Sequence, residues 1–194
     1  AAAEDWMVFG ADDFGIYNVV GGVVVLFSFL TNAMTSSTQR FLNYNFGLKN
    51  ESKVSHIFNV SILTHFTIFL LVLLLSETVG LWFVMTQLNI PVGRETATMW
   101  VYQMSVVTTL IGIMVIPYRA SIIAAERMSI FAYVSILEVA LKLVVVLVLS
   151  YMSFDNLVMY SILLTLVALL NFFIYQIECR RKLSFTKYHF VWDK

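Results

Sequence analysis

Long apolar runs separated by short polar segments dominate this chain. Five runs are each long enough to cross a bilayer as a helix, which takes about 20 residues. The predicted spans cover about residues 14–41, 54–83, 98–117, 130–152 and 157–177. Turn residues and charges interrupt the pattern between them, and the basic run ECRRK follows the last span. The pattern predicts an all-α, polytopic transmembrane helix bundle over residues 13–177.

The first predicted span carries small and polar side chains along one face. Spacings of three and four place seven positions on one side of a helix. They are Asn18, Gly21, Val25, Ser28, Asn32, Thr35 and Gln39, of which only Val25 is apolar. In a membrane helix such a face turns toward other helices or a wet cavity. The stripe ends beside Arg40, so it is either a packing face or the wall of a cavity for a polar or anionic substrate.

Charged residues inside the later spans are the next candidates. Glu138 and Lys142 are four residues apart with Glu first, the favourable order for a helical pair. Charges near mid-bilayer are costly and usually face a partner or a cavity. The pair therefore either fixes helix packing or lines an aqueous path. Pro117 is expected to kink or end the third span, and Arg119 then lies in a tight connection, as an interface anchor or a second cationic wall residue.

Composition excludes most other classes of protein. Hydrophobic residues make up 60% of the chain and charged residues 12%, which rules out an ordinary soluble domain. The single cysteine, Cys179, excludes an internal disulfide, and the three histidines show no metal-ligand spacing. For His56 and His65, which fall in or beside the second span, a polar packing role is expected rather than a metal or proton role. Motifs for phosphate binding, nucleophilic catalysis or zinc hydrolysis are missing from the sequence. We predict a non-enzyme without cofactor, metal or nucleic-acid partner.

The distribution of Lys and Arg predicts the orientation of the bundle. The connection at 40–53 holds three, that at 119–127 two and the tail five of the twelve, all on one side. The positive-inside rule makes this side, with the C-terminus, cytoplasmic. Five spans then place the start of the chain outside. This predicts a six-helix unit whose first helix is missing or truncated, with residues 1–12 as its remnant and 178–194 as a basic tail.

Several segments resemble a known family. They are ADDFGIYNVVGGVVVLFSFLTNAMTSSTQRFL, SETVGLWF and WVYQMSVVTTLIGIMVIPYRASIIAAERMSIFAYVSILEVALKL. Together they resemble bacterial polysaccharide (lipopolysaccharide and O-antigen) flippases of the multidrug/oligosaccharidyl-lipid/polysaccharide exporter superfamily. The resemblance implies two six-helix, MATE-like lobes around a cationic cavity, and alternating access in the bacterial inner membrane. It also implies undecaprenyl-diphosphate-linked oligosaccharide as cargo. This chain would supply the N-terminal lobe and need a second lobe as partner.

These observations combine into a functional hypothesis. Arg40, Arg119 and Lys142, the last paired with Glu138, would attract the diphosphate, while Ser28, Asn32 and Gln39 would line the sugar path. Membrane lipid and glycan-assembly proteins are the further expected partners. The alternatives are a drug/cation antiporter of the same superfamily, a membrane-embedded glycan-assembly enzyme and a non-transporting scaffold.

Overall fold

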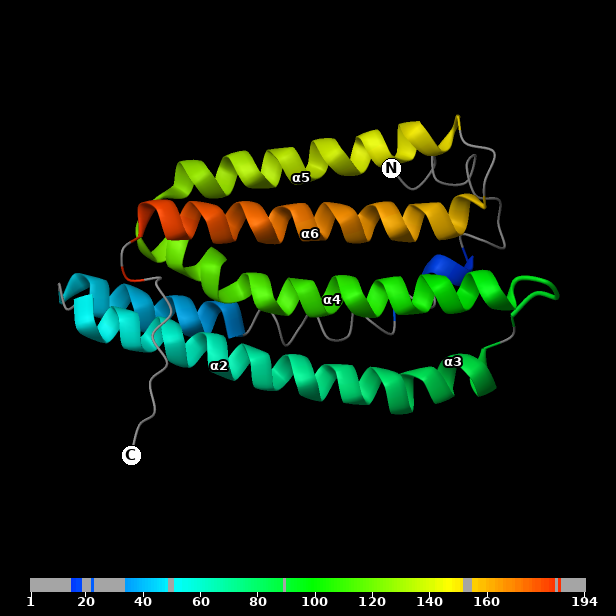
Figure 1. The fold of residues 1–194 in the computed structure, drawn as a ribbon, viewed down its shortest axis with the longest axis horizontal. Coiled ribbons are helices and arrows are strands. Elements are labelled where there is room, and N and C mark those ends of the chain that lie inside the picture. The colour runs from blue at the N-terminus through cyan, green and yellow to red at the C-terminus, as the bar shows by residue number, and fades with distance from the viewer. Residues whose placement is uncertain are drawn as a thin grey trace.

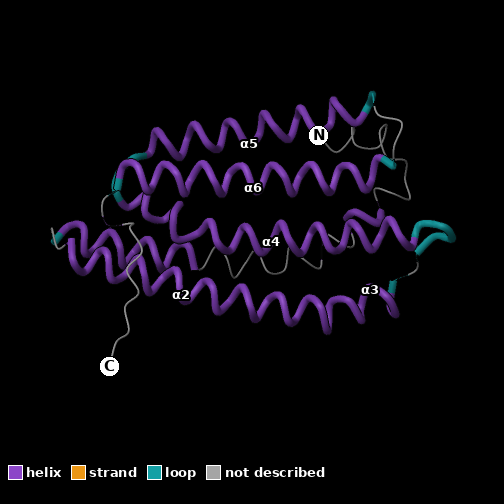
Figure 2. Tube along the Cα trace, viewed as in Figure 1, coloured by secondary structure: helices purple, strands orange, loops and turns teal. Residues whose placement is uncertain are grey.

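The described residues are almost entirely helical. The computed structural model describes residues 15–18, 22, 34–48, 51–88, 90–151, 155–183 and 185. A helix covers residues 34–47. It is followed by α2 (Glu51–Leu75), the π-helical turn η1 (Ser76–Gly80), α3 (Leu81–Gln87), α4 (Glu95–Ala124), α5 (Met128–Leu149) and α6 (Asn156–Lys182). Figures 1 and 2 show these helices side by side, which confirms the predicted all-α bundle.

Four segments of the described chain are long and apolar enough to cross a membrane. They are Ser52–Gln87, Glu95–Ala124, Met128–Leu149 and Asn156–Lys182. These segments correspond to the second to fifth predicted spans. The first predicted span lies mainly outside the described residues, and its last part falls in the helix over residues 34–47. The chain is therefore a polytopic α-helical membrane protein.

The helix α4 is the central element of the bundle. It packs most closely against α6 and also contacts α2 and α5, so that the order across the bundle is α5, α6, α4, α2 (Figure 1). Hydroxyl groups join α4 to α6, because Thr108 Oγ1 lies 2.9 Å from Thr165 Oγ1. The helix over residues 34–47 docks through Leu42, which is fully buried in a cluster with Val54 and Ala120.

The sequence-based end of the third span is wrong. The helix α4 continues through Pro117 to Ala124, so Arg119 belongs to a membrane helix and not to a connection. Figures 1 and 2 show α4 turning toward α5 and α6 near its C-terminal end. Proline has no N–H, so the Ile113 carbonyl one turn earlier loses its helical donor. Carbonyls after this point accept side-chain hydrogen bonds, because Ser121 Oγ donates to the Pro117 carbonyl at 2.8 Å and Cys179 Sγ to the Tyr118 carbonyl at 3.3 Å.

The second span contains a π-helical turn that the hydrophobic pattern does not predict. Within η1, the carbonyl of Ser76 accepts a hydrogen bond from the Tyr102 hydroxyl of α4 at 2.6 Å. A Cβ atom at position 80 would collide with this hydroxyl, so Gly80 permits the approach. The π-turn and the tyrosine together tie α2 to α4 within the apolar core.

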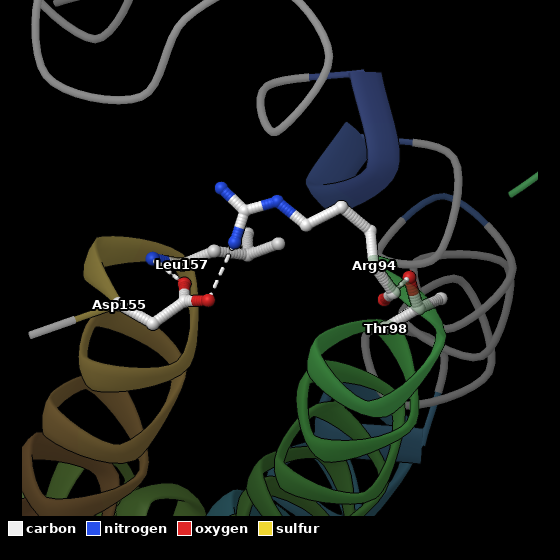
Figure 3. A network of polar contacts seen from close by, with 4 residues as sticks. All are labelled: Arg94, Thr98, Asp155 and Leu157. Carbon is white, nitrogen blue, oxygen red and sulfur yellow. Dashed lines mark hydrogen bonds and ion pairs between the residues drawn. The ribbon is translucent and has the colours of Figure 1, made fainter. Parts of the chain in front are cut away.

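An ion pair joins the N-terminal ends of α4 and α6. Arg94 Nη1 donates to Asp155 Oδ2 at 2.5 Å, and the other carboxylate oxygen accepts from the Leu157 backbone N–H at 3.1 Å (Figure 3). Asp155 is thus the N-cap of α6 as well as the partner of Arg94. The Arg94 carbonyl in turn accepts from the Thr98 hydroxyl at 2.8 Å. One carboxylate therefore holds two helix ends together.

We predict that Asp155→Ala lowers the free energy of unfolding by about 1 kcal/mol, because it removes the N-cap of α6. The ion pair adds little to this, since both side chains are 36% exposed. Thermal unfolding in detergent measures the effect. Asp155→Asn is the matched control, because its amide oxygen can still cap α6. An equal loss in both variants would contradict the capping role.

The C-terminal end of α4 is a Schellman turn with a strained residue. The Arg127 N–H donates to the Ile122 carbonyl at 3.1 Å and the Glu126 N–H to the Ile123 carbonyl at 3.0 Å. This pattern requires a left-handed residue at the turn, and Glu126 adopts it with φ 56°. Glycine is the usual residue there, because a Cβ disfavours this conformation.

Glu126→Gly is accordingly expected to raise the free energy of unfolding by about 1 kcal/mol. Glu126→Ala provides the control, because alanine removes the carboxylate but keeps the Cβ atom. Chemical or thermal unfolding of both variants separates backbone strain from the charge effect. Stabilisation by alanine as large as that by glycine would show that the carboxylate, not the backbone, is unfavourable.

Candidate functional site

A half-buried arginine lies between α4 and the helix over residues 34–47. Arg119 of α4 reaches the helix over residues 34–47, where its Nη2 lies 3.3 Å from Thr35 Oγ1. Thr35, one residue of the predicted polar stripe of the first span, thus contacts Arg119 of the third span. No ion pair joins Arg119 to a carboxylate of the described residues. Within the described part of the chain, the Arg119 guanidinium therefore contacts a neutral hydroxyl and no carboxylate, inside a membrane span.

The neighbouring part of α6 is apolar around a tyrosine. Tyr175 of α6 is buried in one cluster with Tyr118 of α4 and Val134 of α5. The polar contact of Arg119 in the described part of the chain is therefore the one with Thr35. We call Thr35 and Arg119 the Arg119 cluster.

The predicted Glu138–Lys142 pair forms on α5. Lys142 Nζ lies 2.6 Å from Glu138 Oε1, which confirms the i,i+4 pairing. The side chains are 53% and 38% exposed, respectively, on the surface of the described bundle. The Lys142 ammonium is therefore paired on α5, on a different helix from Arg119. The role of the Glu138–Lys142 pair at an aqueous path stays a prediction.

Arg40 lies apart from these groups, on the exposed face of the helix over residues 34–47. It lines a hollow of about 720 Å³ together with Ser36, Ser37, Phe41 and Tyr44. A second groove, of about 450 Å³, lies between the same helix and α2 and shares Ser37 and Phe41 with the first. The two hollows therefore lie next to each other along the same helix. The helix over residues 34–47 thus offers a cationic groove on one face and Thr35 to Arg119 on another.

Of the remaining candidate residues, Gln39 alone belongs to the described part of the chain. Gln39 is half-buried on the helix over residues 34–47. Asn32 and Ser28 lie outside the described residues. Among the described residues, no group of three or more His, Cys, Asp or Glu side chains could hold a metal ion. The described candidates therefore divide into the Arg119 cluster, the exposed α5 pair and the Arg40 groove.

Sequence reasoning missed two residues beside these sites. Tyr175 has no charge and lies in an apolar span, so nothing in the local pattern distinguishes it from a packing residue. His65 was expected only to pack, yet it lines the groove between the helix over residues 34–47 and α2. The available signal was Ser61, four residues earlier and therefore on the same helix face.

Comparisons with known proteins give no assignment: no protein-family model, no curated protein and no solved structure matches this chain. The fold and the polar groups define an all-α polytopic membrane protein with cationic groups within and beside its spans. Function is therefore inferred from these groups.

For the α5 pair, we expect Glu138→Gln and Lys142→Met each to lower the melting temperature more than the double variant does. Each single change leaves one unpaired charge within an apolar span, whereas the double change removes both. Thermal unfolding of the purified protein in detergent gives the comparison. Strictly additive losses would show that the two charges do not depend on each other.

Proposed function

We propose that this chain is a transporter lobe, part of a flippase that moves an undecaprenyl-diphosphate-linked oligosaccharide across the bacterial inner membrane. The product would serve lipopolysaccharide, O-antigen or capsule biosynthesis. One observation carries the proposal: Arg119 is half-buried in a membrane span, with no carboxylate partner among the described residues. Charged groups in such positions mark substrate pathways. A guanidinium binds phosphate oxygens in a bidentate manner, which suits a diphosphate cargo.

The other cations extend the proposed route. Arg40 lines the exposed groove and would meet the diphosphate as it enters from the membrane surface. Lys142 is exposed near the middle of α5 and would face a second six-helix lobe across the cavity. Gln39, with Ser28 and Asn32, would contact the sugars. Transport would follow alternating access, with charge and hydrogen bonding but no covalent chemistry.

The charge at the two ends of the bundle supports the proposed orientation. Lys53, Arg127 and the Arg180–Lys182 run belong to helix ends that lie together, whereas Arg94 lies at the opposite end (Figure 1). Under the positive-inside rule the first end, with the C-terminus, is cytoplasmic. The diphosphate would then reach Arg40 and Arg119 from the side on which lipid-linked intermediates are assembled.

The decisive experiment replaces Arg119 in cells that depend on this gene for surface polysaccharide. Arg119→Ala should reduce export about tenfold or more, because a charge-assisted hydrogen bond contributes about 1.5–3 kcal/mol. Arg119→Lys should retain part of the activity, since it keeps the charge but loses the bidentate geometry. Surface polysaccharide per unit of membrane protein is the measurement.

Arg181→Ala is the matched control, because it removes one exposed cation of α6 and leaves the Arg119 cluster intact. Normal export by Arg119→Ala at normal protein levels would remove Arg119 from the mechanism. Loss of drug resistance with intact polysaccharide would instead favour an antiporter of organic cations.

A further inference from the structure

The helix α5 lies at one side of the described bundle and carries two charges within a membrane span (Figure 1). Among the described helices it packs against α6 and, less closely, against α4. Glu138 lies about 15 Å along the helix from both Met128 and Leu149, by the rise of an α-helix. Lipid headgroups lie at the ends of a span and not at its middle. Charges at this depth face protein or a water-filled cavity.

Within the described part of the chain, Glu138 and Lys142 pair only with each other. Lys142 Nζ lies 2.6 Å from Glu138 Oε1, and neither side chain makes another hydrogen bond or ion pair to a described residue. An ammonium has three donors and a carboxylate has two acceptor oxygens, so one contact leaves most of this capacity unused. Both side chains are also more than one third exposed. The pair is therefore open to a partner that offers it a donor and an acceptor.

The surface beside the pair allows another helix to approach. Four accessible positions share the face of Lys142, by spacings of three and four residues. They are Ala132, Ser135, Val139 and Val146. Their side chains are short, and short side chains let membrane helices come close together. A partner helix on this face would therefore lie within reach of both charges.

A second copy of α5 matches the charges of this face. Two copies in one membrane have the same orientation, so a two-fold axis along the membrane normal places their α5 helices parallel and at equal depth. Glu138 of one copy then lies one helical turn away in depth from Lys142 of the other. The long lysine side chain can span such an offset, as it does within one helix. The same surface thus supplies both the donor and the acceptor that the pair can still bind.

We propose that α5 forms the interface of a symmetric homodimer, in which Glu138 of each copy pairs with Lys142 of the other. The four charges then make four favourable Glu–Lys contacts, two within the copies and two between them. Only one Glu–Glu and one Lys–Lys repulsion oppose these contacts. The dimer also supplies the second six-helix lobe opposite Lys142 as a second copy of this chain. That identification alone rests on the function proposed above.

Charge reversal distinguishes pairing between copies from pairing within one copy. Full-length chains with two different affinity tags are expressed together in one membrane, and co-purification in mild detergent measures their association. Glu138→Lys alone and Lys142→Glu alone should each self-associate about tenfold less than the wild type, because like charges then meet across the interface. Glu138→Lys expressed together with Lys142→Glu should restore association, since opposite charges then meet between the copies although not within either copy.

The matched control is the Glu178–Lys182 pair of α6, which has the same spacing but lies at a helix end. Glu178→Lys, Lys182→Glu and their co-expression should all associate as the wild type does. Melting temperatures verify that each variant is folded. Wild-type copies that do not associate, or a mixed pair of Glu138→Lys and Lys142→Glu that associates no better than either variant alone, would overturn the proposal.

Cross-linking tests the same face with both charges intact. Val139→Cys places a thiol on the proposed interface, whereas Leu137→Cys places one on nearly the opposite side of α5. Both positions are exposed, and the native thiol of Cys179 is buried on α6. Oxidation in native membranes should form covalent dimers through Val139→Cys and not through Leu137→Cys. Dimers through Leu137→Cys alone, or through neither, would contradict the proposed interface.

These association measurements are independent of polysaccharide export. A dimer that exports no polysaccharide would contradict the transport function and leave the interface in place. Export by a chain that does not dimerise would contradict the interface and leave the transport function in place.

Discussion

Within a bilayer, backbone polar groups must find their partners inside the protein, and this constraint explains most departures from regular helix in the bundle. At the π-turn of α2, the Ser76 carbonyl accepts from the Tyr102 hydroxyl. Around Pro117, the Ser121 hydroxyl and the Cys179 thiol serve the carbonyls of Pro117 and Tyr118. At the end of α4, the Schellman turn satisfies two further carbonyls and forces Glu126 into a left-handed conformation. Hydrogen bonds thus accompany each irregularity, from another helix at Ser76 and Tyr118 and from within α4 or its C-terminal turn elsewhere.

The need to pair buried polar groups also explains why polar side chains join the helices. Lipid tails are as apolar as leucine, so packing and polar contacts must hold membrane helices together. Thr108 and Thr165 meet between α4 and α6, and Thr35 meets Arg119 between the helix over residues 34–47 and α4. Thr35, Thr108 and Thr165 carry small hydroxyl groups, whose burial costs little free energy when they are hydrogen-bonded. Arg119 is different, because a hydroxyl does not neutralise its charge.

The sequence predicted the existence of the helices better than their ends and their faces. Apolar length alone located the second to fifth spans, since a bilayer imposes a minimum length on any crossing helix. The end of the third span was misplaced because a helix that packs against its neighbours tolerates a proline, and the packing of α4 on α6 is not visible in the sequence. The pairing of Glu138 with Lys142 followed from their spacing, but their exposure did not, because spacing does not show which face a neighbour covers. His65 shows the reverse case: its i−4 partner was visible in the sequence, whereas its unsatisfied Nε2 required the structure.

The helix over residues 34–47 connects the two polar regions of the bundle. Thr35 contacts Arg119 of α4, while Thr38 contacts Ser61 of α2 beside His65. Both contacts are single hydroxyl interactions longer than 3.2 Å, so they restrain this helix less than the burial of Leu42 does. A rotation of the helix about its axis would move Thr35 and Thr38 together and change both contacts at once. The position of this short helix therefore sets the contact of Arg119 on one face and the groove beside His65 on the other.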